Sequence, residues 1–178
     1  MNLAAQLLSI VSLAGAVLGV DHRDARRPPA PCSADSSFRR LSFWVGDWTV
    51  YDSTGKQYAS QRVRDILDQC AITAEWASGG GNKGLGIFAY DVRSGGWRQM
   101  YVSNQTPQPS GIVLRQSDPT YTGPGVRFVA MDPPRAGAVR SRITIAPSPG
   151  GVTELFEDSR DDGQTWITVF KAEHRPAQ

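Results

Sequence analysis

The sequence predicts an all-β protein, an antiparallel up-and-down barrel of about ten strands that follows a short N-terminal helical turn. Eighteen Gly and twelve Pro among 178 residues separate short apolar runs, as is typical of a β protein with many turns. The runs recur roughly every 12 residues, and no long helical periodicity interrupts them. Ten strands in one open sheet would leave two exposed edges, so closure is favoured, with a two-sheet sandwich as the alternative.

The expected strands are the alternating or apolar segments between these turns. Strands joined by short turns pair with their neighbours in sequence, which makes the sheet a meander. Val63 and Ile66 are out of phase within the second strand, so we expect a bulge there. The expected strands cover residues 48–52, 61–69, 70–78, 85–92, 97–104, 112–117, 126–132, 139–147, 152–159 and 166–175.

Residues 1–20 are expected to be a signal peptide. The apolar stretch Leu7–Val20 contains no charged side chain and is too short to span a bilayer, while small residues permit cleavage after Ala16 or Gly19. An uncleaved anchor or a misassigned start is the alternative. With a cleaved signal, the protein is secreted or periplasmic and is not stably inserted in a membrane.

The rest of the chain divides into a leader and one domain. Residues 21–42 are charged and Pro-rich, without apolar periodicity, and we expect an extended leader. Within it, Ser36 or Ser37 is expected to cap a helical turn over residues 38–41. Residues 43–176 form the barrel, which has an ordinary size for a single domain.

Two cysteines, Cys32 and Cys70, are expected to form a structural disulfide, because an even count in an exported protein favours pairing. Closing this loop would stabilise the fold by roughly 3–4 kcal/mol. Two free buried thiols are one alternative. A redox pair is disfavoured because the two residues lack the close spacing that tunes a thiolate.

The charge balance argues against nucleic acid and against anionic membranes as partners. The chain carries 19 basic and 17 acidic side chains, a formal net charge of +2. Its 40% hydrophobic and 20% charged residues are typical of a globular protein rather than a disordered one. The oligomeric state is left open by these observations.

One local motif is specific. Residues 159–166 fit the pattern S-x-D-x-G-x-T-W, the Asp-box of sialidase-type propellers. Asp161 is suited to accept hydrogen bonds from turn N–H groups, Gly163 to supply a positive φ, and Trp166 to pack over the turn. The motif occurs once, so it predicts a β-hairpin and not glycosidase activity.

Metal and nucleophile chemistry find little support, and we expect no metal and no cofactor. The only histidines are His22, in the leader, and His174, interpreted as a surface residue at the frayed end of the last strand; haem ligation by His174 is the alternative. No G-x-S-x-G elbow is present. The Gly79–Asn82 run precedes a strand, so it is not expected to cradle a phosphate.

The remaining chemistry lies in polar and aromatic residues within strands, where alternate side chains face the lumen of a barrel. Glu75, Glu157 and Arg142 could form a buried ion-pair network, or each could be solvated on the outer face. The candidate catalytic residues are Glu75, Glu157, Tyr101 and Arg142. The candidate ligand-binding residues are Trp76, Trp97, Gln99, Tyr101, Arg142 and Phe128.

Four segments together resemble an uncharacterised bacterial family of exported lipocalin-like, calycin-type barrels. These segments read FWVGDWTVYD, DQCAITAEW, YDVRSGGWRQMYV and SRDDGQTW, and the resemblance extends from Phe43 to about Phe170. It implies a ten-stranded barrel whose lumen can hold a small apolar molecule, without implying one activity. Gln69 departs from the Gly usual in the family, and Tyr101 from a Trp, which allows a different ligand or acquired catalysis.

Three functions are compatible with this sequence. The leading one is binding of a small hydrophobic or aromatic molecule in the lumen. The second is a cofactor-independent isomerase, cyclase or lyase in which Glu75 or Glu157 acts as general acid or base, with Arg142 or Tyr101 as its partner. The third is a structural module with a filled barrel. A lumenal carboxylate facing an apolar wall would favour the enzyme.

Overall fold

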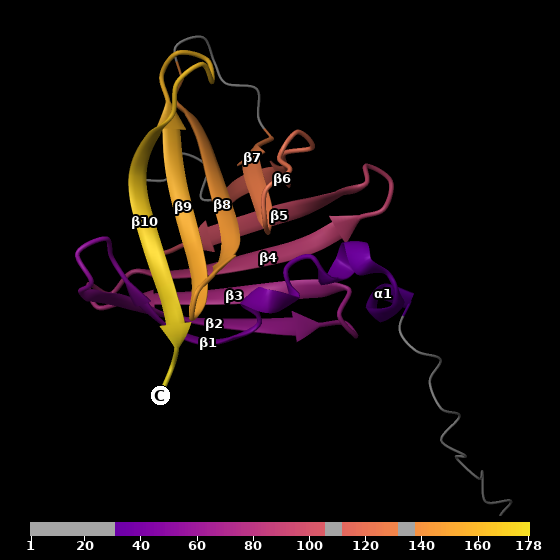
Figure 1. Cartoon of the computed structure of the whole chain (residues 1–178), viewed down its shortest axis with the longest axis horizontal. Coiled ribbons are helices and arrows are strands. Elements are labelled where there is room, and N and C mark those ends of the chain that lie inside the picture. Colours follow the sequence, from indigo (N-terminus) through magenta and orange to yellow (C-terminus); the bar gives the residue numbers. More distant parts are fainter. Residues whose placement is uncertain (1–30, 106–111, 132–137) are drawn as a thin grey trace, which may run out of the picture.

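The computed structural model describes residues 31–105, 112–131 and 138–178. It contains a closed antiparallel barrel in which each strand pairs with its neighbours in sequence and the last strand pairs with the first (Figure 1). The all-β up-and-down barrel is therefore confirmed, and the sandwich alternative is wrong. The strands are β1 (Gly46–Tyr51), β2 (Gln57–Ile66), β3 (Ala71–Ser78), β4 (Lys83–Asp91), β5 (Gly96–Ser103), β6 (Ile112–Ser117), β7 (Val126–Ala130), β8 (Arg140–Ser148), β9 (Gly151–Ser159) and β10 (Ile167–Pro176).

The expected signal peptide and the start of the leader lie outside the described residues. From Pro31 onward the leader is helical rather than extended, with α1 (Pro31–Ala34), η1 (Ser36–Arg39) and η2 (Ser42–Trp44), the last two being 3₁₀ turns. The cap of η1 is Asp35, not Ser36 or Ser37: its carboxylate accepts the Ser37 N–H at 2.8 Å. Asp35 has the extended backbone that a capping residue needs, and a carboxylate is a strong acceptor.

These helical turns close one end of the barrel. Leu41 and Trp44 are fully buried, and the Trp44 ring packs edge-on against Phe88 of β4 with centroids 5.1 Å apart. The Trp97 indole N–H of β5 donates to the Ser37 carbonyl at 3.1 Å, which ties η1 to the sheet. We call these turns, α1, η1 and η2, the plug. The plug leaves the opposite end of the barrel as the route to the lumen.

The expected disulfide between Cys32 and Cys70 is confirmed, and it joins α1 to the residue that precedes β3. The expected bulge at Val63 and Ile66 is wrong, because the β2–β3 register runs without a shift up to Ile66. The chain turns after Ile66 instead, through three residues with left-handed φ, 67–69. This turn places Cys70 beside α1.

The Asp-box forms the β9–β10 hairpin that its sequence predicts. Asp161 accepts hydrogen bonds from the Thr165 hydroxyl, from the Thr165 N–H at 2.8 Å and from the Ser159 hydroxyl at 2.7 Å, and these bonds hold the pKa of its carboxyl at about 2. Gly163 has a φ of +92°, and the Trp166 indole N–H donates to its carbonyl. The motif is thus a structural device at the rim.

Two β-bulges elsewhere aim aromatic side chains at the lumen. Opposite Val50 and Tyr51 of β1, strand β2 carries one extra residue, Tyr58. A second irregularity interrupts the β9–β10 register between Thr168 and Phe170. Both lie at the barrel end opposite the plug, where they shape the walls of the cavity described next.

Candidate lumenal binding site

A cavity of about 320 Å³ lies inside the barrel, above the plug. This volume is at the low end of the range for small-molecule sites, and its lining combines aromatic walls with a few polar groups, which is the usual composition of such sites. The lining residues are Trp44, Tyr58, Gln61, Ala74, Trp76, Asn82, Lys83, Gly86, Phe88, Gln99, Tyr101, Ser103, Gln105, Val113, Arg115, Ile143, Ile145, Glu154, Phe156 and Phe170.

Four rings form a continuous aromatic arc on the upper wall. Tyr58 packs against both Trp76 and Phe170, at centroid distances of 5.8 and 5.3 Å, and Phe170 packs against Phe156 at 5.6 Å. The two bulges bring Tyr58 and Phe170 into this arc from strands β2 and β10. Because rings stack favourably at these distances, the arc offers a rigid face to a flat apolar molecule.

Two glycines of β4 make room for side chains at the cavity. A Cβ placed on Gly84 would lie 2.0 Å from the Tyr101 hydroxyl, and one on Gly86 would lie 2.7 Å from the Phe88 ring. Any larger residue at these positions would displace the ring above it. The small residues therefore set where the Tyr101 phenol and the Phe88 ring lie.

Glu154 of β9 places a carboxyl group in the cavity. Glu154 is only 5% exposed, and this burial raises the pKa of its carboxyl to about 7. A hydrogen bond from the Gln61 side-chain amide acts in the opposite direction. Near neutral pH this group therefore exists in both protonation states. A carboxyl with such a pKa is suited to exchange protons with a bound molecule.

His174 of β10 lies beside Glu154 and not at the surface, so its expected place at a frayed strand end is wrong. It is 1% exposed, its Nε2 atom is 3.9 Å from a Glu154 carboxyl oxygen, and neither ring nitrogen has a hydrogen-bond partner. Burial lowers the pKa of His174 to about 4. The end of β10 does not fray, because Glu173–Pro176 pair with β1, and His174 points inward on this paired segment.

Arg115 of β6 brings a guanidinium group to the cavity. It donates from Nη1 to the Gln99 side-chain oxygen at 3.3 Å, while its Nε is buried without a partner. Burial lowers the pKa of Arg115 to about 10, so the group stays charged at neutral pH. Burial raises the pKa of the Tyr101 phenol. The Glu154 carboxyl acts in the same direction, and the Arg115 guanidinium acts in the opposite one.

Of the expected ligand-binding residues, Trp76, Gln99 and Tyr101 line the cavity. Trp97 and Phe128 are fully buried but are not part of the lining. Trp97 is bound to η1 at the plugged end, and Phe128 packs against Phe88 at 5.5 Å, below the cavity. These two rings fill the closed end of the barrel.

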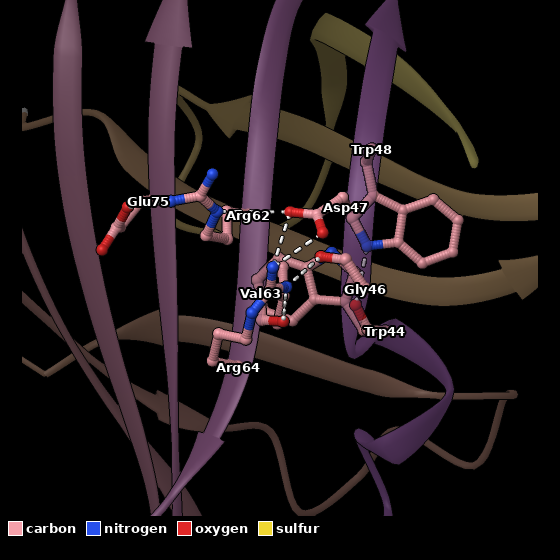
Figure 2. Close-up of polar contacts among 8 residues, drawn as sticks. All are labelled: Trp44, Gly46, Asp47, Trp48, Arg62, Val63, Arg64 and Glu75. Atoms are coloured by element: carbon pink, nitrogen blue, oxygen red, sulfur yellow. Dashed lines mark hydrogen bonds and ion pairs between the residues drawn. The ribbon is translucent and has the colours of Figure 1, made fainter. Parts of the chain in front are cut away.

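Glu75 is on the outer face of the barrel rather than in the lumen. Its neighbours Ala74 and Trp76 line the cavity, and strand alternation turns Glu75 outward, where its side chain is 61% exposed. Figure 2 shows it beside Arg62, within a surface cluster that Asp47 and Arg64 complete. Glu75 therefore cannot contact a lumenal ligand.

Arg142 and Glu157 form an ion pair, but not a lumenal one. The Arg142 Nε is 2.7 Å from a Glu157 oxygen, and its guanidinium stacks on the Trp166 ring at 4.0 Å. Their strand neighbours Ile143 and Phe156 line the cavity, so alternation directs this pair to the outer face. The pair supports the Asp-box hairpin.

Several polar residues of the site were not among the sequence candidates, Glu154 and Arg115 above all, and His174 was considered only as an alternative haem ligand. Glu154 lies between Val152 and Phe156 in period-two alternation, which marks it as inward-facing once the register is known. Arg115 and His174 follow the same logic on β6 and β10. The signal was present in the alternation, but the sequence does not state which of the two faces points inward.

The fold and the cavity define a class: a closed ten-stranded barrel with a lumenal cavity that opens at one end. Comparison of this chain with models of protein families finds no match, and comparison with curated proteins finds none either. Within the described ranges, no helix is long and apolar enough to cross a membrane. In the same ranges, no cluster of three His, Cys, Asp or Glu side chains is arranged to hold a metal.

Proposed function

We propose that this protein is an exported, lipocalin-like carrier that binds a small, largely aromatic or hydrophobic molecule in its lumen. The observation that carries the proposal is the cavity of about 320 Å³ with its arc of aromatic rings. A filled structural barrel is disfavoured because aromatic side chains fill only the plugged end. Burying a flat ligand of this size at about 25 cal/mol per Å² gives roughly micromolar affinity after association costs.

Export is supported by two independent features. Residues 1–20 have the composition of a signal peptide. The Cys32–Cys70 disulfide is typical of oxidising compartments such as the periplasm and the extracellular space. We therefore propose that the carrier works in the cell envelope or outside the cell.

Filling the lumen is expected to remove binding. Ala74 of β3 is buried and lines the cavity, so Ala74→Phe places a ring where the ligand would lie. Native mass spectrometry of the protein exported by its own host should show a bound molecule on the wild type, and about tenfold less on this variant. Ala77→Phe is the matched control, because Ala77 is exposed on the same strand. Equal loading of all three proteins would contradict the proposal.

A second candidate, cofactor-independent acid–base catalysis, is favoured by one observation. Glu154 is a buried carboxyl within an aromatic cavity, with a pKa raised to about 7, and Tyr101 lies within its electrostatic reach. Such a group can move a proton to or from a bound substrate. Isomerase, cyclase or lyase chemistry needs no more than that proton transfer and a shaped cavity.

The catalytic candidate predicts proton exchange that depends on Glu154. The co-purified molecule, incubated with wild-type protein in deuterium oxide, should gain deuterium at carbon, and Glu154→Gln should slow this gain roughly 100-fold or more. Glu75→Gln, on the outer face, should leave the rate unchanged. No exchange above the uncatalysed rate with wild-type protein would leave the carrier as the better account.

A further inference from the structure

Among the described lining residues, three hydrogen-bond donors lack partners, against one pure acceptor, the side-chain oxygen of Gln61. The Arg115 Nε and the Trp44 indole nitrogen are buried and make no hydrogen bond, and the same holds for the Ser103 hydroxyl. Gln99 uses its side-chain oxygen to accept from Arg115, so the NH₂ group is what it can still offer. Unpaired buried donors cost free energy, which a ligand with acceptor atoms would offset.

The cavity also holds an uncompensated positive charge. Among the described residues, no carboxylate lies within ion-pair distance of Arg115; Asp158 acts on it only at longer range. Lys83 adds a second cation at the exposed mouth. Glu154 is the one acidic residue among the described lining residues, and its burial favours the neutral form. Arg115 is half-buried, and a partly desolvated cation without a carboxylate partner is costly, so this site favours an anionic guest.

We propose that the lumen binds an aromatic carboxylate, with the carboxylate group held by Arg115 and Tyr101 and the ring against the aromatic arc of Tyr58, Trp76, Phe156 and Phe170. This inference rests on the proposed carrier function and names the class of its ligand. Arg115 pairs with Gln99 across β5 and β6, and Tyr101 lies two residues further along β5 on the same lumenal face. A guanidinium binds a carboxylate through two parallel hydrogen bonds, and the phenol can donate a third.

Two isosteric probes test the ligand class. 2-Naphthoate and 2-naphthamide share one ring system and differ in the charge of the head group. By isothermal titration calorimetry at pH 6, wild-type protein should bind the acid about tenfold or more tightly than the amide. Arg115→Gln should weaken 2-naphthoate binding about tenfold while changing 2-naphthamide binding less than about twofold. Arg115→Lys keeps the charge but loses the two parallel hydrogen bonds that a guanidinium makes to a carboxylate. This variant should retain part of the preference for 2-naphthoate over 2-naphthamide.

The control is Arg127→Gln. Arg127 belongs to the adjacent strand β7 and lies on the outer face, where it donates to the Thr144 hydroxyl and stacks on Tyr121. This variant should bind both probes as the wild type does. Equal affinity of the wild type for acid and amide, or an equal loss of both in Arg115→Gln, would overturn the inference while leaving the carrier standing. Binding of neither probe, together with no co-purified molecule, would overturn both.

Discussion

Replacing both cysteines by serine is expected to lower the free energy of unfolding by about 4 kcal/mol. The disulfide joins residues separated by 38 positions, and the chain-entropy model assigns about this stabilisation to a loop of that length. The Cys32→Ser/Cys70→Ser protein should therefore unfold at a distinctly lower guanidinium concentration than the wild type, as measured by tryptophan fluorescence. A loss of that size is a large part of the stability of a single domain.

Reduction with dithiothreitol and probe binding by the double variant distinguish the effect of the disulfide on stability from any effect on the binding site. Dithiothreitol should destabilise the wild type and leave the double variant unaffected. Probe binding by the folded double variant should persist, because η2 remains held by the buried Leu41 and Trp44. A drop in unfolding free energy below about 1 kcal/mol would show that the plug, and not the cross-link, secures the closed end.

Most of the barrel could be predicted from sequence because its signals are local. Short apolar runs between Gly- and Pro-rich turns marked all ten strands, and the Asp-box marked the β9–β10 hairpin residue by residue. The bulges were harder to predict. Val63 and Ile66 look irregular in sequence, yet the actual bulge residue Tyr58 follows from pairing with β1, which only the closed sheet defines.

The lumenal site was predicted less well, for a physical reason. Alternation divides each strand into two faces but assigns neither to the lumen, and polar residues occur on both faces here. Arg142 and Glu157 form an outer ion pair, whereas Glu154, three residues earlier than Glu157, faces inward. Trp76, Gln99 and Tyr101 were among the candidates because aromatic and amide side chains are typical of ligand sites, and the register places all three on the lumenal face.

Replacing Glu154 by Gln is expected to add an acid-sensitive contribution to the free energy of unfolding that the Glu154–His174 pair of the wild type lacks. In the wild type, burial shifts the two neighbouring groups in opposite directions: the pKa of Glu154 rises from 4.5 to about 7, and that of His174 falls from 6.5 to about 4. The groups lie 3.9 Å apart, and the pH dependence of the stability is set by the total number of protons that the two groups bind in each state.

The Glu154–His174 pair contributes little to the pH dependence of the wild-type free energy of unfolding, because the folded and unfolded states bind nearly the same number of protons at each pH. The folded pair holds two protons below about pH 4, one up to about pH 7 and none above, while the unfolded chain changes at 4.5 and 6.5. The number of bound protons differs between the folded and unfolded states only near pH 4 to 4.5 and near pH 6.5 to 7. Stability falls slightly as the pH drops below 4.5, where the unfolded chain protonates first, and as it rises above 6.5, where the unfolded chain deprotonates first. Each loss is under about 1 kcal/mol.

Without the carboxyl, His174 titrates alone. Its low pKa comes from burial, and Glu154 is itself protonated and uncharged where the folded imidazole titrates, so replacing it by the neutral Gln should leave the shift in place. The unfolded histidine then takes up a proton near pH 6.5 and the folded one only near pH 4. Stability present above pH 6.5 is therefore lost as the pH falls to 4, by about 3 kcal/mol.

Urea unfolding of wild type and Glu154→Gln at pH 7 and pH 4 measures this difference, and carboxylates elsewhere cancel in the comparison. The variant should lose about 3 kcal/mol more than the wild type on acidification. The double variant Glu154→Gln/His174→Gln should lose this excess, since no buried imidazole remains to protonate. Parallel pH profiles for wild type and Glu154→Gln would mean that the buried imidazole is not held neutral. The small net contribution of the Glu154–His174 pair to the pH dependence of the wild type would then need another explanation.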